Sequence, residues 1–184
     1  MLSLFIFIFS TTFLTLIWLF TYTLIHEITH YVIANHYHRT KCIILLFNVK
    51  KEKVIYKNKN LFICKTPRLS FNGLTLLENN YRIYTTHQIK KIAIAPRFVQ
   101  IIYYIMLKTL FDLVFFAIIK EKFLVFLLID FIFVLIVIIF SLRKGTSGWT
   151  DINIYRDPAG YLDYTKTSLS EDETYEYWRN LLCI

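Results

Sequence analysis

Long uncharged stretches are the dominant pattern of this sequence. From Leu2 to Ile25 there is no Asp, Glu, Lys or Arg, and Leu, Ile, Phe and Thr fill most positions. A helix of that length measures about 36 Å, which exceeds a hydrocarbon core of about 30 Å and allows for tilt. The pattern predicts a first membrane span over about residues 2–35, and two later hydrophobic segments predict spans over about 92–119 and 122–142.

The segments between and after these spans follow different patterns. Residues 41–66 alternate between apolar runs and Lys/Asn clusters, which predicts a short β-hairpin or meander with solvated turns. Residues 67–88 are expected to be irregular, with Asn72-Gly73 marking a turn. The polar tail, residues 143–184, is expected to end in an amphipathic helix that begins at Ser170 and presents an apolar stripe of Tyr175, Trp178 and Leu182.

Composition and charge place these elements relative to a membrane. Hydrophobic residues make up 56% of the 184 positions, and the net charge is +8. Residues 37–91 hold twelve Lys/Arg against two Glu, whereas the tail from Arg143 holds five Lys/Arg against seven Asp/Glu. A basic segment beside a membrane helix is typical of the cytoplasmic face, where anionic lipid attracts it. No nucleic-acid motif accompanies the charge, so nucleic acid is not an expected partner.

The predicted fold class is therefore mainly α: an integral-membrane helical bundle of three to four spans with a small cytoplasmic β-hairpin region. The whole chain, residues 1–184, is expected to form a single domain. The charge distribution predicts a multi-pass protein of the cell membrane, of bacterial type, with its N-terminus outside. The cytoplasmic side then carries the end of the first span and the entire polar tail.

A chemical motif occupies that end of the first span. His26-Glu27-Ile28-Thr29-His30 has the form HExxH, which on a helix is a signature of zinc hydrolases. Histidines four residues apart on a helix are rotated by only about 40°, so one metal ion can bind both. Glu27, one residue along, is placed to reach a metal-bound water rather than the metal, as a general base must.

A zinc hydrolase site needs a third protein ligand, and several candidates compete for that role. His36 has the spacing of the metzincin pattern, but Ile33 occupies the position where that pattern requires glycine. Glu52 and Glu78 are candidates for a distant glutamate ligand, although Glu52 lies within a lysine cluster typical of a solvated turn. None of these three is favoured.

Acidic residues later in the chain are stronger candidates. Asp130 lies in the middle of the third span, where pairing with Lys108 or Arg97 is the simpler interpretation. Asp151 and Asp163 both belong to the polar tail, on the side of the membrane that carries the HExxH motif. A carboxylate suits a site with two histidines, so these residues leave two alternatives open.

A family resemblance favours one of them. HExxH at the end of a first membrane helix resembles the site-2-protease group of intramembrane metalloproteases. Within that group the chain is most similar to the zincin-peptidase family of small bacterial membrane proteins, on three segments: His26–His30, Ile92–Pro96 and Gly145–Asp151. The resemblance implies that Asp151 is the third ligand. Asp163 ranks second, because Pro158-x-x-x-Leu162-Asp163 resembles a motif of the site-2 proteases.

The expected function is a zinc-dependent, membrane-embedded peptidase that hydrolyses a peptide bond in or near the bilayer. His26, His30 and Asp151 are expected to bind Zn²⁺, and Glu27 to activate the zinc-bound water. Its partners are then membrane lipids and a peptide or membrane-protein substrate. The alternative is a non-catalytic membrane protein, serving as a binding, accessory or immunity factor, with a structural or vestigial zinc site.

Overall fold

Helices occupy the hydrophobic segments of the sequence, as expected. The computed structural model describes residues 2–47, 52–66, 73–78, 81–118, 123–142, 151–167 and 170–183. The long helices are α1 (Leu2–Tyr37), α2 (Thr86–Ile118) and α3 (Phe123–Leu142). The chain divides into two compact units. Unit 1 comprises Met1–Tyr22 and Arg97–Arg143, and unit 2 comprises Thr23–Pro96 and Lys144–Ile184. The prediction of a single domain stays a prediction.

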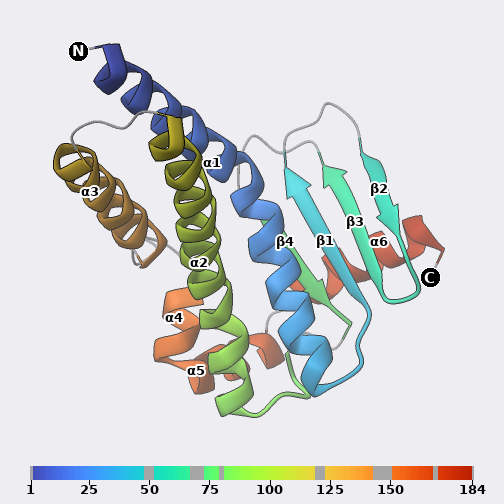
Figure 1. Cartoon of the computed structure of the whole chain (residues 1–184). Helices are drawn as coiled ribbons and strands as arrows, with labels where there is room; N and C mark the ends of the chain where they lie inside the picture. The colour runs from blue at the N-terminus through green and yellow to red at the C-terminus, as the bar shows by residue number, and fades with distance from the viewer. Residues whose placement is uncertain are drawn as a thin grey trace. The chain divides into compact units, whose positions relative to one another are not determined.

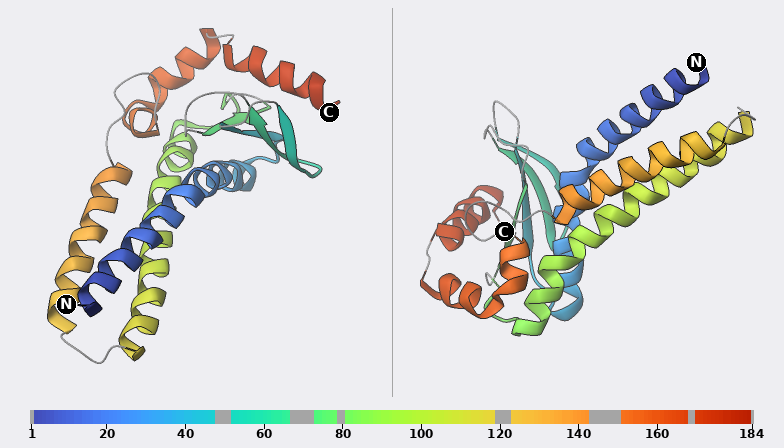
Figure 2. Two further views of the ribbon diagram at one scale, coloured as in Figure 1. Left: turned by 90° about the horizontal axis from the view of Figure 1, so that it is seen from above. Right: turned by 90° about the vertical axis from the view of Figure 1, so that its left-hand side faces the viewer.

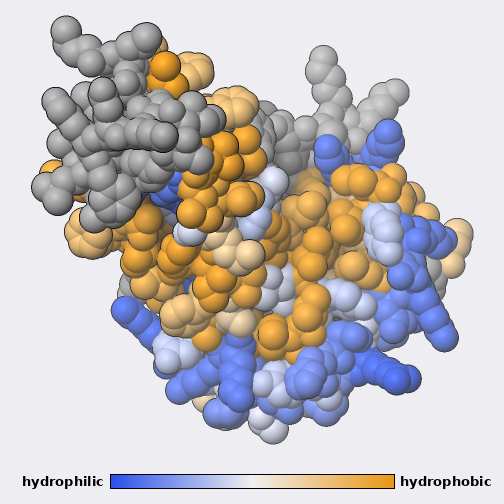
Figure 3. Space-filling view, in the orientation of Figure 1, coloured by the Kyte–Doolittle hydropathy of each residue, from blue (hydrophilic) through white to orange (hydrophobic). Residues whose placement is uncertain are grey.

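Unit 1 carries large apolar side chains on its surface and buries one lysine in its interior. Lys108 is only 2% exposed and forms ion pairs with Asp112 and, at 2.5 Å, with Asp130. This confirms the pairing with Lys108 expected for Asp130. The outward positions of the same helices are hydrophobic, and they include Phe5, Phe9, Phe13, Met106, Leu110, Leu113, Leu128 and Phe131, each at least 59% exposed. In Figure 3 hydrophobic residues cover much of the visible surface of α1 and α2.

Unit 2 is built around a sheet of four described strands (Figure 1). Their spatial order is β2-β3-β1-β4, and β1 lies parallel to β3 but antiparallel to β4. β2 and β3 form an antiparallel pair. The strands are β1 (Cys42–Phe47), β2 (Lys53–Lys57), β3 (Leu61–Thr66) and β4 (Gly73–Leu77).

Alternation along the strands gives this sheet two apolar faces. Ile43 and Leu45 pack against Tyr175 and Trp178 of α6 (Ser170–Leu182). The apolar stripe expected for the last helix is therefore confirmed. Cys42 and Ile44 face the other way, into a cluster with the C-terminal half of α1, the start of α2, and the short helices α4 (Asp151–Arg156) and α5 (Pro158–Thr167). Both views in Figure 2 place α6 on the opposite side of the sheet from α1.

The expected fold class is wrong on two counts. Among the described residues, one helix is long and apolar enough to cross a membrane, Thr86–Phe115, or two if the bent pair Phe5–Leu19 and Thr21–Tyr37 counts as one span. The described apolar stretch of α3, Leu128–Ile139, is shorter than a span. The expected small hairpin is part of a four-stranded mixed sheet with its own core, so the chain is not a bundle of three to four spans.

The β-structure also extends further along the chain than expected. Gly73 begins β4 within the segment expected to be irregular, while Asn72, the other residue of the expected turn, lies outside the described residues. Of the segment Gly145–Asp151, which carries part of the family resemblance, only Asp151 lies within the described residues.

Candidate metal centre

The C-terminal half of α1 carries the HExxH motif into unit 2. His26, Glu27 and His30 are 8%, 7% and 5% exposed, so the motif is buried rather than displayed on a solvated helix face. The helical repeat places the two imidazoles on one side of α1, and their Nε2 atoms lie 3.2 Å apart. One ion can therefore contact both rings.

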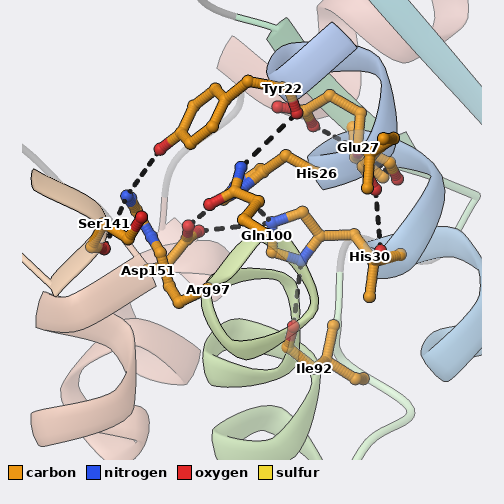
Figure 4. A network of polar contacts seen from close by, with 12 residues as sticks. Tyr22, His26, Glu27, His30, Ile92, Arg97, Gln100, Ser141 and Asp151 are labelled. Atoms are coloured by element: carbon orange, nitrogen blue, oxygen red, sulfur yellow. Dashed lines mark hydrogen bonds and ion pairs between the residues drawn. The ribbon is translucent and has the colours of Figure 1, made fainter. Parts of the chain in front are cut away.

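Asp151 completes the group from a distant part of the sequence. It is the first residue of α4, and its Oδ2 lies 2.8 Å from Nε2 of His26 while Oδ1 lies 3.3 Å from Nε2 of His30. Figure 4 shows the three side chains pointing toward one another. Together they form a group that could hold a metal ion. Asp163, the second-ranked alternative, is exposed on α5 and is not part of this group.

A main-chain carbonyl orients the ring of His30. Its Nδ1 lies 3.0 Å from the carbonyl oxygen of Ile92 in α2. A carbonyl only accepts, so Nδ1 carries a proton, and Nε2, which faces Asp151 and His26, is the nitrogen left to bind a metal ion once it is deprotonated. The sequence explains why this carbonyl is available. Pro96, four residues later inside α2, has no N–H with which to make the helical bond to Ile92.

The charges of the group reinforce one another. Burial on its own lowers the pKa of His30, but the negative charge of Asp151 and the hydrogen bond to it outweigh burial and raise that pKa. Burial on its own raises the pKa of Asp151, but the charge of His30 and the hydrogen bonds from both histidines hold it well below its usual range. The Asp151 carboxylate is therefore anionic at neutral pH, and a metal ion would have to displace the proton from Nε2 of His30 to bind.

Strand β4 holds the side chain of Glu27. The hydroxyl of Thr75 donates to Oε2 of Glu27 at 2.6 Å, and its oxygen also lies 3.3 Å from the Glu27 carbonyl oxygen. Gly73, two residues earlier, lies so close that a Cβ there would come within 2.5 Å of Cγ of Glu27. The motif glutamate is thus fixed by residues nearly fifty positions away in the sequence.

The spacing of the donor atoms suits a metal ion with tetrahedral ligands. Bond lengths of about 2.0–2.2 Å in a tetrahedron place ligand atoms about 3.4 Å apart. Nε2 of His26 lies 3.2 Å from Nε2 of His30 and 2.8 Å from Oδ2 of Asp151, and Nε2 of His30 lies 3.3 Å from Oδ1 of Asp151. Small shifts of these side chains therefore bring one donor atom from each to that spacing. In a tetrahedral site, two imidazoles and one carboxylate would leave the fourth position open.

The other candidates for a third ligand lie elsewhere. His36, Glu52 and Glu78 are exposed, and none belongs to the group around His26. Asp130 belongs to unit 1, where it pairs with Lys108. Sequence reasoning missed Gly73 and Thr75, because a glycine and a threonine in a short strand carry no signal of contact with a distant glutamate.

Comparisons of the chain with protein-family models, curated proteins and solved structures found no match.

Proposed function

We propose that the protein is a zinc-dependent peptidase, with His26, His30 and Asp151 as ligands and Glu27 as the general base. The observation that supports this most strongly is the convergence of three side chains from α1 and α4. The Nε2 atoms of His26 and His30 lie 3.2 Å apart, and each lies 2.8 to 3.3 Å from an oxygen of Asp151, which is 121 residues beyond His30 in the sequence. A site that needed no metal would have little reason to bury two imidazoles beside each other.

The donor chemistry favours zinc among the common divalent ions. Imidazole nitrogen suits zinc and other late transition metals, whereas magnesium and calcium prefer oxygen ligands throughout. When bound, the ion would polarise the scissile carbonyl and activate a water molecule. The raised pKa of His30 and the lowered pKa of Asp151 describe the metal-free group, in which protons take the place of the cation.

Glu27 has the position and the surroundings of a general base. It adjoins His26 in the sequence, and its carboxylate is buried and held by Thr75. In the proposed reaction Glu27 takes a proton from the attacking water and delivers it to the leaving amine. A structural zinc site has no use for such a base, which is why the peptidase is preferred over a non-catalytic binding or accessory protein.

We also propose that unit 1 contacts lipid, so that the substrate is a peptide or membrane protein at or near the bilayer. The support is the exposure of many large apolar side chains on unit 1, together with the burial of Lys108, which pairs with Asp112 and Asp130 inside the unit. The basic loop residues of unit 2 would favour the cytoplasmic face.

Glu27→Gln separates the two functional alternatives. The amide keeps the shape of the side chain but cannot take a proton, so we expect hydrolysis of a quenched fluorescent peptide library in detergent micelles to fall at least about 10²-fold. Metal content should stay at the wild-type level, because Glu27 is not a ligand. Glu78→Gln, at an exposed glutamate following β4, is the matched control and should change neither quantity.

Full activity of the Glu27→Gln variant would contradict the peptidase proposal. A wild-type protein that binds zinc tightly but cleaves nothing in the library would favour the non-catalytic alternative.

A further inference from the structure

Strand β4 contacts the motif glutamate at two points on one face. Residues 73, 75 and 77 point to the same side of the strand, and Leu77 packs in the core shared with α1. Figure 1 shows β4 running behind the C-terminal half of α1. Gly73 and Thr75 therefore face Glu27, as their distances confirm.

The hydrogen bond from Thr75 fixes one carboxylate oxygen. A hydroxyl has a single proton, and the 2.6 Å separation from Oε2 is much shorter than the 3.3 Å separation from the Glu27 carbonyl oxygen. The proton therefore goes to the carboxylate, in a short bond to a charged acceptor. Thr75 is itself 9% exposed, so water cannot readily replace its hydroxyl.

Gly73 leaves the space that the glutamate side chain fills. A Cβ at this position would lie 2.5 Å from Cγ, 2.8 Å from Cδ and 2.8 Å from Oε1 of Glu27. Atoms do not approach that closely, so any other residue at position 73 must displace the Glu27 side chain or the strand. The absence of a side chain here serves packing rather than a turn, because Gly73 begins the strand.

We propose that Thr75 and Gly73 are positioning residues for Glu27: the hydroxyl fixes Oε2, and the missing side chain fixes the path of the carboxylate between α1 and β4. This inference rests on the proposed function. A glutamate side chain has three rotatable bonds, and a general base works only within hydrogen-bond reach of the proton it takes. With Oε2 engaged by Thr75, Oε1 is the oxygen left to take that proton among the contacts that the structure describes.

Binding of acetohydroxamic acid tests the placement of Glu27 without a substrate. The probe coordinates a metal through its two oxygens and shares its acidic proton with a neighbouring base, so its affinity depends on where that base lies. The full-length protein is loaded with cobalt(II) in detergent, and titration is followed by the visible absorption of the bound cobalt. Cobalt content and the melting temperature are measured on every variant.

Three variants and one control give distinct expectations. Thr75→Val removes the hydroxyl at constant shape and should weaken the probe about tenfold or more, while Thr75→Ser should stay within about twofold of wild type. Gly73→Ala should weaken the probe like Thr75→Val. Thr66→Val makes the same change at a buried threonine of β3, on the opposite face of the sheet, and should have no effect. Cobalt content should be unchanged throughout.

Wild-type probe affinity in Thr75→Val would overturn the positioning role. So would an equal loss in Thr75→Ser, or a loss of cobalt or of folding in Thr75→Val, since the effect would then be structural. If the wild-type protein takes up neither cobalt nor the probe, the proposed metal site itself fails, which is a separate result.

Discussion

At the scale of single residues, the site combines a local pattern with contacts that no spacing reveals. His26, Glu27 and His30 follow from the periodicity of a helix, because positions one and four apart on a helix have fixed relative directions. Asp151 is 121 residues from His30; the charge distribution left it level with Asp163, and only a family resemblance favoured it. Thr75 and Gly73 carried no signal, since their role depends on tertiary packing.

Pro96 illustrates how one residue can affect stability and metal binding in opposite directions. Pro96→Ala supplies an N–H that can bond to the carbonyl of Ile92, which the ring of His30 now uses. Loss of such an orienting contact typically weakens metal affinity about 10- to 100-fold. We expect weaker zinc binding in competition with a chelator, at a melting temperature equal to or above wild type because a helix-interior proline is removed.

Pro158→Ala is the matched control for this prediction. Pro158 is the first residue of α5, where a missing N–H costs nothing, so its replacement should leave zinc affinity unchanged. Wild-type affinity in Pro96→Ala would show that the Ile92 carbonyl does not orient His30.

At the scale of elements, hydrophobic runs predicted the helices well and the strands incompletely. The expected helix over residues 2–35 matches α1, and Phe123–Leu142 matches the third segment. Strand β4 was missed because five residues of a strand gain their stability from neighbours in the sheet, here β1, rather than from a long local pattern. The sheet has two apolar faces because the C-terminal half of α1 packs on one and α6 on the other. These contacts join separate elements of the chain, so no local pattern predicts them.

Adjacent leucines near the end of α6 test how this helix is held on the sheet. Leu182 is 6% exposed and packs with Trp178, whereas Leu181 is 51% exposed. Leu182→Ala should lower the free energy of unfolding by about 2 kcal/mol or more. Leu181→Ala should change it by less than about 1 kcal/mol. Denaturant titration in detergent measures both, and equal effects would contradict the packing of α6 described here.

At the scale of the whole molecule, composition indicated an apolar protein but not how its apolar surface is divided. The hydrophobic segments suggested a bundle of three to four spans, yet a large share of the apolar side chains lies in the core of unit 2, on both faces of its sheet. Hydropathy counts residues along the chain and does not distinguish a side chain facing lipid from one facing a sheet. The most exposed of the large apolar side chains belong to unit 1, where Lys108 is buried with Asp130 as its partner.

The exposed apolar side chains of unit 1 predict how the protein fractionates. Surfaces of this kind are rarely left in contact with water. The full-length protein should sediment with membranes, resist extraction by alkaline carbonate and be released by detergent. A protein that stays monodisperse in aqueous buffer without detergent would contradict lipid contact by unit 1.

Metal content of the detergent-purified protein, after incubation with zinc and removal of excess, tests the central claim most directly. Wild type should retain about one zinc per chain, as a three-ligand site predicts. Asp151→Ala should lose it, and Asp163→Ala, which removes an exposed carboxylate of the same tail, should keep it. A wild-type chain without zinc, or an Asp151→Ala variant that binds it as tightly as wild type, would contradict the metal centre proposed here.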